Sequence, residues 1–100
     1  MENNILKTRR ELIIEMLEEK SMSIREMADI LNLPVKTVTQ DLDSVRKTIR
    51  SESKKIEVQP AKCKACNYVF IGRSRISDPH KCPKCHSERI EPQNFRITTI

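Results

Sequence analysis

Apolar residues recur at helical spacing in three stretches of the first half of the chain. The first stretch, residues 5–17, carries its apolar residues broadly on one face, with Arg9 as an interruption and charged residues opposite. The second stretch has apolar residues at i, i+3, i+4 and i+7: Ile24, Met27, Ala28 and Leu31. The third alternates steps of three and four: Val35, Val38, Leu42, Val45 and Ile49. The pattern predicts three helices, over residues 5–17, from residue 24 onward, and over about 35–50.

Local signals mark the ends of the second helix. Ser23 and Glu26 have the spacing of a capping box, which places the start of the helix after Ser23. Asn32 tolerates the left-handed conformation that ends helices, and Pro34 suits the start of the next helix. A three-residue turn therefore separates the second and third helices. This is the plan of a helix-turn-helix, whose second motif helix enters the DNA major groove.

The second half of the chain predicts short β-strands. Residues 56–58 alternate apolar and polar and are ended by Pro60, and further candidates are residues 68–71, 89–91 and 95–98. The predicted fold class is α+β, with a helix-turn-helix domain over residues 1–53 and a small β domain over 54–100. A winged helix would add a β-hairpin after the third helix, and the sequence leaves open whether such a wing is present.

All four cysteines stand in two Cys-x-x-Cys pairs, Cys63/Cys66 and Cys82/Cys85. This spacing is typical of a zinc ribbon, in which two tight turns aim four thiolates at one metal, at about 2.3 Å from each sulfur. Four thiolates leave no open coordination position, so the predicted Zn²⁺ is structural. Two disulfides or two redox pairs are the alternatives. The sequence disfavours them because it shows neither a secretory signal nor a βαβ pattern around either pair.

Residues beside the two pairs agree with a fold held by metal. Asn67 and His86 directly follow the pairs, where the backbone of such a turn enters the left-handed region. His80 and His86 are not expected to be ligands, since four thiolates already fill the site. A segment of about forty residues rarely folds alone without metal, disulfides or a partner. We therefore expect one zinc ion to stabilise the second domain.

Composition and charge narrow the classes of function. One glycine and 3% aromatic residues argue against a large β core. The net charge of +5 suggests an anionic partner, but residues 1–50 are balanced and the excess lies in residues 61–100. No apolar run is long enough to cross a bilayer and no signal peptide is evident, so we expect a cytoplasmic protein without a membrane partner. No catalytic constellation or phosphate loop is present, so we expect neither an enzyme nor a small-molecule substrate.

The stretch from Met27 to Leu42 resembles the helix-turn-helix of bacterial and archaeal regulators of the DeoR type. Ala28 matches the small residue at the crossing of the two helices. Thr37-Val38 and Asp41-Leu42 match the family's Thr-(Ile/Val)-x-x-Asp-Leu run. The chain departs from the family at residues 39 and 40, where arginines are common.

The helix-turn-helix is followed by the four-cysteine segment and by the residues Glu91-Pro92-Gln93-Asn94-Phe95-Arg96-Ile97. In this order the chain resembles archaeal predicted transcriptional regulators in which a helix-turn-helix is fused to a zinc ribbon. The resemblance covers nearly the whole chain. It implies DNA binding and a role in transcription.

Candidate DNA contacts lie on the third helix, off its apolar seam. Gln40 can pair with adenine, and Lys36 can reach guanine or phosphate. The residues expected to face bases are Lys36, Thr37, Thr39, Gln40 and Asp43. Those expected to contact phosphates are Arg46, Lys47 and Arg50. A second basic cluster, formed by Arg73, Arg75 and Lys81, could bind phosphates or an acidic protein.

Three functions follow as hypotheses. The first is a sequence-specific regulator that binds double-stranded DNA as a homodimer, because one short helix reads few base pairs. The apolar seam of the third helix could also pair two chains, although a core face is the commoner role. The second hypothesis is a protein-interaction adaptor that docks on the transcription machinery, motivated by the charge-neutral helical half. The third is a rubredoxin-like electron carrier, since two Cys-x-x-Cys pairs also hold iron.

Overall fold

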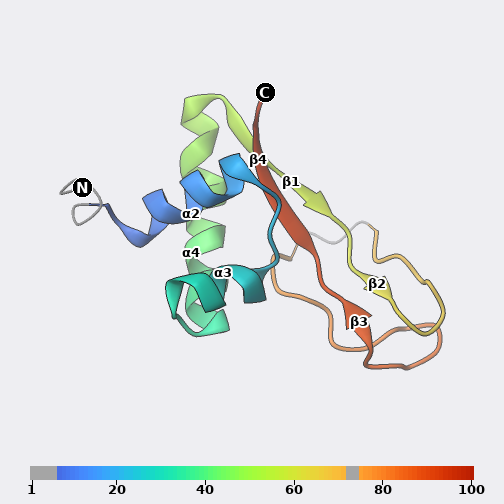
Figure 1. Ribbon diagram of the computed structural model, residues 1–100. Helices are drawn as coiled ribbons and strands as arrows, with labels where there is room; N and C mark the ends of the chain where they lie inside the picture. Colours follow the sequence, from blue (N-terminus) through green and yellow to red (C-terminus); the bar gives the residue numbers. More distant parts are fainter. Residues whose placement is uncertain (1–6, 72–74) are drawn as a thin grey trace.

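The computed structural model describes residues 7–71 and 75–100, in which helices precede strands along the chain (Figure 1). Three α-helices come first: α2 (Arg9–Glu19), α3 (Ile24–Leu31) and α4 (Val35–Thr48). One turn of 3-10 helix, η1 (Ile49–Glu52), continues α4. The strands are β1 (Lys54–Gln59), β2 (Lys62–Cys63), β3 (Ile90–Glu91) and β4 (Asn94–Thr99). The predicted α+β class, with three helices and a small β part, is confirmed.

The helix α2 begins later than the periodicity predicted. The N–H of Glu11 donates to the Thr8 hydroxyl over 3.2 Å, and the N–H of Thr8 donates to the Glu11 carboxylate over 2.8 Å. This capping box makes Thr8 the N-cap residue. Lys7 and Thr8 were predicted to be helical, and they lie before the helix instead. Ile5 and Leu6 lie outside the described residues.

The predicted turn between the second and third helices is confirmed. Ser23 and Glu26 exchange the two hydrogen bonds of a capping box at the start of α3, over 3.2 and 2.9 Å. Asn32 ends α3 in the left-handed conformation, with φ 56 and ψ 49. The N–H of Leu33 then donates to the Ala28 carbonyl over 3.0 Å, which satisfies one of the last carbonyls of the helix.

The main β-sheet pairs two strands that are far apart in the sequence. β1 runs antiparallel to β4, with Lys54 opposite Thr99 at one end and Gln59 opposite Asn94 at the other. Met22, which connects α2 to α3, adds a bridge to Phe95 of β4 through backbone hydrogen bonds of 3.0 and 2.8 Å. The smaller pair, β2 with β3, stands apart as a separate sheet.

The residues between the two long strands form an insert. We use this term for residues 60–93, which leave the sheet after β1 and return to it at β4 (Figure 1). Both Cys-x-x-Cys pairs lie within the insert. Because Gln59 and Asn94 are opposite one another, the insert begins and ends at the same end of the two-stranded β1–β4 sheet.

The main core lies between the helices and the β1–β4 sheet. The seam of α4 faces inward and is fully buried at Val38, Leu42 and Val45, and it continues to the buried Ile49 of η1, so its predicted role as a core face is confirmed. Val35 departs from that seam and is 40% exposed. Ile56 of β1 packs against this core, and Phe95 and Ile97 of β4 belong to it. Ile76 of the insert also joins the main core, where its side chain is 8% exposed.

The insert has a second and much smaller apolar cluster. Its buried members are Ala61, Cys63, Phe70 and Cys82. The rings of Tyr68 and Phe70 meet edge to face, with centroids 5.1 Å apart. The strand predicted over residues 68–71 is wrong, because Val69 makes only an isolated bridge and the Tyr68 carbonyl closes the preceding turn. The other three predicted strands are confirmed as β1, β3 and β4.

Across residues 7–71 and 75–100, no helix has the length and apolar character to span a bilayer.

Candidate functional site

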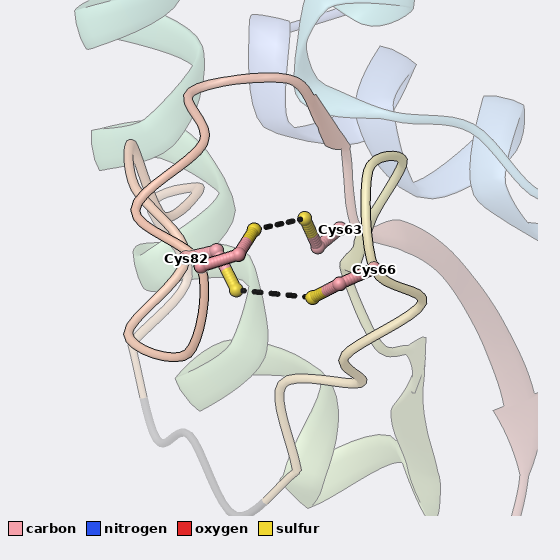
Figure 2. Close-up of side chains that lie close together, drawn as sticks. Cys63, Cys66 and Cys82 are labelled. Atoms are coloured by element: carbon pink, nitrogen blue, oxygen red, sulfur yellow. Dashed lines mark hydrogen bonds between the residues drawn. The ribbon is translucent and has the colours of Figure 1, made fainter.

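The four cysteines converge on one point inside the insert. The Sγ atoms of Cys63 and Cys85 lie 3.6 Å apart, as do those of Cys66 and Cys82, and all four sulfurs fall within 4.8 Å of one another. Figure 2 shows the labelled sulfurs of Cys63, Cys66 and Cys82 pointing toward a common centre. A disulfide would bring two sulfurs to about 2.05 Å, so the thiols are free. A tetrahedron of sulfurs about 2.3 Å from Zn²⁺ has edges of about 3.8 Å, which the observed separations fit.

Two turns of the same design present the ligands. In the first turn, the N–H of Asn67 donates to the Cys63 carbonyl over 2.9 Å, and the N–H of Cys63 donates to the Tyr68 carbonyl over 2.8 Å. In the second turn, the N–H of His86 donates to the Cys82 carbonyl over 2.8 Å, and the N–H of Cys82 donates to the Ser87 carbonyl over 2.9 Å. Asn67 and His86 both have φ 66, so the predicted left-handed conformation at these two positions is confirmed. The site therefore consists of two copies of one backbone motif.

Backbone N–H groups favour the thiolate at one cysteine of each pair. Burial opposes ionisation of Cys82, but the N–H groups of Cys85 and Lys84 outweigh it and lower the pKa of Cys82 to about 7. The N–H of Lys84 lies 3.4 Å from the Cys82 sulfur. At Cys63, burial is likewise outweighed by the N–H groups of the turn, which lower its pKa. A low thiol pKa favours metal binding because the thiolate is the ligand.

The pKa of Cys66 shows why the cluster of thiolates needs a cation. The N–H of Tyr68 favours the Cys66 thiolate, but burial and the neighbouring sulfurs act in the opposite direction and raise the pKa of Cys66 to about 12. Four thiolates within 4.8 Å repel one another unless a positive charge lies between them. Zn²⁺ supplies that charge, and four thiolates complete its coordination shell. The donor set therefore fits one structural zinc ion.

The histidines near the pairs are not part of this cluster. His80 and His86 are both exposed, and the metal-binding group found among the described residues consists of the four cysteines.

The exposed face of α4 carries most of the predicted DNA-contact residues. Lys36, Gln40, Lys47 and Arg50 are exposed, and Asp43 is half buried between them. These positions are separated by steps of four, three, four and three residues, so they follow one strip along the helix and onto η1. We call these five residues the α4 strip.

Three other predicted contacts, Thr37, Thr39 and Arg46, are half buried. The Thr39 hydroxyl donates to the Val35 carbonyl over 2.8 Å. The Arg46 guanidinium donates to the Asp43 carboxylate over 2.7 Å, and the Lys47 ammonium lies 3.8 Å from the other carboxylate oxygen. Asp43 therefore forms ion pairs with Lys47 of the strip and with Arg46 beside it.

The second basic cluster is described in part. Arg73 lies outside the described residues, while Arg75 and Lys81 are exposed. Both line a cleft of about 390 Å³ on the insert, together with Phe70 and His80. The structure thus brings Arg75 and Lys81 to the same cleft, as their grouping in the sequence predicted.

The sequence reasoning missed two polar residues that join distant elements. Asp41 is 6% exposed and meets Arg9 of α2, with Nη2 at 3.3 Å from Oδ1 and Nε at 3.0 Å from Oδ2. Asp41 stands three residues after Val38, and residues at that spacing share one face of a helix. The sequence therefore did indicate that Asp41 lies beside the buried seam. Gln93 is 3% exposed and bonds to residues 76–78 of the insert. No sequence signal marks it, because glutamine between Pro92 and Asn94 is typical of an exposed loop.

Comparison with known proteins agrees with this division into helices and a metal-holding β part. Residues 8–56 match the family described as "PF0610-like, N-terminal". Residues 60–99 match the "PF0610 rubredoxin-like zinc beta-ribbon domain". No curated protein matches the chain.

One solved structure is similar over nearly its whole length. It is the solution NMR structure of protein PF0610 from Pyrococcus furiosus, with a TM-score of 0.79 and 36% sequence identity. The match covers 92% of this chain and 90% of that one. The four clustered cysteines and both matched segments lead to one conclusion: the chain belongs to the PF0610 family, with an N-terminal PF0610-like domain and a rubredoxin-like zinc β-ribbon.

Proposed function

We propose that the protein is a DNA-binding transcriptional regulator whose helix α4 lies in the major groove of double-stranded DNA. The observation that carries this proposal is the α4 strip. Its polar and cationic side chains face solvent on a helix whose opposite face is fixed by four fully buried residues. A helix held firmly along one side and polar along the other has the arrangement of a groove-reading helix.

The strands support a winged-helix version of this proposal. In that fold a short segment between the first two helices pairs with a hairpin that follows the third helix. Here Met22 bridges β4, and β4 pairs with β1 directly after η1. We therefore assign β1 and β4 as the two strands of a wing whose tip is replaced by the zinc-binding insert.

The chemistry of the α4 strip suits both kinds of DNA contact. Gln40 offers the amide that pairs with the N6 and N7 edge of adenine, and Lys36 offers a donor for guanine or phosphate. Arg46, Lys47 and Arg50 are placed later along the helix and are assigned to the phosphate backbone. One helix of this length reads few base pairs, so we propose a homodimer on half-sites about 34 Å apart.

The test is selection of duplexes from a random pool by the full-length, zinc-loaded protein at low salt. Enrichment of a sequence and a linear fall of log K with log salt are expected. Gln40→Ala should relax selection at one base pair and cost about 1–3 kcal/mol. Lys55→Ala, which removes an exposed lysine on β1, is the matched control and should leave the selected sequence unchanged. A pool that stays unenriched, with binding insensitive to salt, would overturn the proposal.

A protein-interaction adaptor is the second candidate function. The observation that favours it is apolar exposure on the insert, where Ile71 is 79% and Val69 is 39% exposed. In this version the insert docks on the transcription machinery. A stoichiometric protein partner that is lost with Ile71→Asp but retained with Lys36→Ala and Gln40→Ala would favour it over DNA binding.

Both candidates are binding functions, and we propose no catalytic step. Zinc has no redox chemistry in proteins, so a zinc site does not support the electron-carrier hypothesis.

A further inference from the structure

We propose that Arg75 of the insert contacts the DNA backbone beside α4, and that Gln93 is the positioning residue that holds it there. This inference rests on the proposed function and adds a second contact element to it. In this arrangement the zinc-binding insert takes part in DNA binding through one defined loop.

The first observation is the place of Arg75. It lines a cavity of about 160 Å³ together with Arg46 of α4 and with Ile56 and Phe95 from the two strands of the sheet. The next residue, Ile76, is buried in the main core. The loop of the insert is therefore seated against the helical part of the molecule, with Arg75 exposed at its start.

The second observation is the set of hydrogen bonds that fixes the loop. The side-chain Nε2 of Gln93 donates to the carbonyls of Ile76 and Ser77, over 3.0 and 3.2 Å. The Nε2–Asp78 Oδ1 separation is 3.4 Å, and the backbone N–H of Gln93 donates to the same oxygen over 2.9 Å. Gln93 is buried, so breaking these bonds leaves unsatisfied polar groups inside the protein. The loop that begins at Arg75 is thus tied to the junction of β3 and β4.

The third observation is the sequence of positive charges along this surface. Arg75 lines both the cavity shared with Arg46 and the cleft shared with His80 and Lys81. Basic side chains therefore follow one another from the last turn of α4, where Arg46 is paired with Asp43, onto the insert. Asp78 is the acidic residue among those lining the cleft, and its Oδ1 already accepts from Gln93.

These charges favour a polyanion with regularly spaced charges. Cations side by side repel one another and gain most from a partner that places several negative charges along a line. A DNA strand flanking the groove that holds α4 has this property, and arginine suits phosphate because its guanidinium can donate two parallel bonds. The strip on α4 and the loop of the insert then bind one duplex.

The test compares arginine variants of the full-length, zinc-loaded protein on one duplex over a series of salt concentrations. Arg75→Ala should weaken binding and reduce the slope of log K against log salt by about 0.9, the value for one lost phosphate contact. Arg75→Lys keeps the charge and should keep most of the slope. Arg96→Ala is the matched control, because Arg96 is exposed between Phe95 and Ile97 and so projects from the sheet face opposite to the core. It should leave the slope unchanged.

A double-mutant cycle tests the positioning role. Gln93→Glu keeps the shape of the side chain but replaces the donating amide by an acceptor facing two carbonyls. It should lower the salt slope as Arg75→Ala does, and the double variant should be no weaker than either single variant. If Gln93→Glu fails to fold, Ile76→Ala loosens the same loop and enters the cycle in its place. Additive losses would overturn the positioning role, since Gln93 would then act independently of Arg75.

The outcomes separate this inference from the proposed function. If Arg75→Ala binds like the parent protein while Lys36→Ala and Gln40→Ala bind weakly, the inference is overturned and the proposed function stands. If the parent protein binds no duplex, the proposed function fails first. If Arg75→Ala loses binding to poly-glutamate but not to DNA, the surface serves an acidic protein and the inference is overturned.

Discussion

Removal of zinc should unfold the insert and leave the main core folded but weaker. The buried cluster of the insert has four members, two of which are ligands of the metal, and its strands β2 and β3 are two residues long. So little buried apolar area does not offset the conformational entropy of the segment. The main core, by contrast, contains nine residues of the helices, Met22 between α2 and α3, and two residues of β4, none of which needs a metal contact.

The size of the effect on the main core follows from two losses. Without metal, β1 and β4 are joined by a flexible loop of about 34 residues, whose closure costs about 3 kcal/mol from (3/2)RT ln n. Ile76 also leaves the main core, which removes about 1–2 kcal/mol of burial. The sum is about 4–5 kcal/mol, out of the 5–15 kcal/mol or so that is typical of a domain. At about 4–8 °C for each kcal/mol, the midpoint of thermal unfolding should fall by roughly 16–40 °C.

Amide NMR spectra and circular dichroism melts with and without excess EDTA measure both parts of this prediction. Signals from residues 63–70 and 82–90 should collapse toward random-coil positions, while those of α3, α4, β1 and β4 stay dispersed. Zinc added back should restore the spectrum. Collapse of all signals together would refute the reasoning, because the main core would then depend on the metal. Unchanged signals from the insert would also refute it, because the insert would then fold without the metal.

Substitutions at three further positions test the fold and the proposed DNA-facing helix. Phe95→Ala removes a buried ring from the main core and should lower the free energy of unfolding by about 3–5 kcal/mol, measured by urea titration. Asn32→Gly should be tolerated and Asn32→Ala should cost about 1–2 kcal/mol in the same assay, because the residue has φ 56. Asp43→Asn weakens the ion pairs with Arg46 and Lys47 and should raise affinity for non-specific duplex DNA several-fold at low salt, with a steeper salt slope; an unchanged slope would contradict this.

The parts of the structure that could be predicted from the sequence are those with local causes. The seam of α4 follows from spacing alone, because residues three or four apart share one face of a helix. The metal site follows from the Cys-x-x-Cys spacing, since each turn determines its own geometry and the metal joins the two. The capping box of Thr8 and Glu11 was equally readable, but the apolar residues before it suggested an earlier helix start.

The parts that could not be predicted depend on contacts between distant residues. The pairing of β1 with β4 joins positions separated by the whole insert, and nothing in either strand specifies the other as its partner. The same holds for Ile76, an isolated apolar residue in a polar loop that is buried only because the loop lies against the helices. Gln93 is buried for the same reason, since the carbonyls it bonds belong to that loop.

The position of the insert has a consequence for how this architecture can change. Its two ends meet at a pair of residues that face each other across a ladder, Gln59 and Asn94. A tight two-residue hairpin turn can join strands at such a pair without shifting their register. The metal-binding module is thus exchangeable: evolution or a protein engineer can shorten, replace or graft it while every strand partner outside it stays the same.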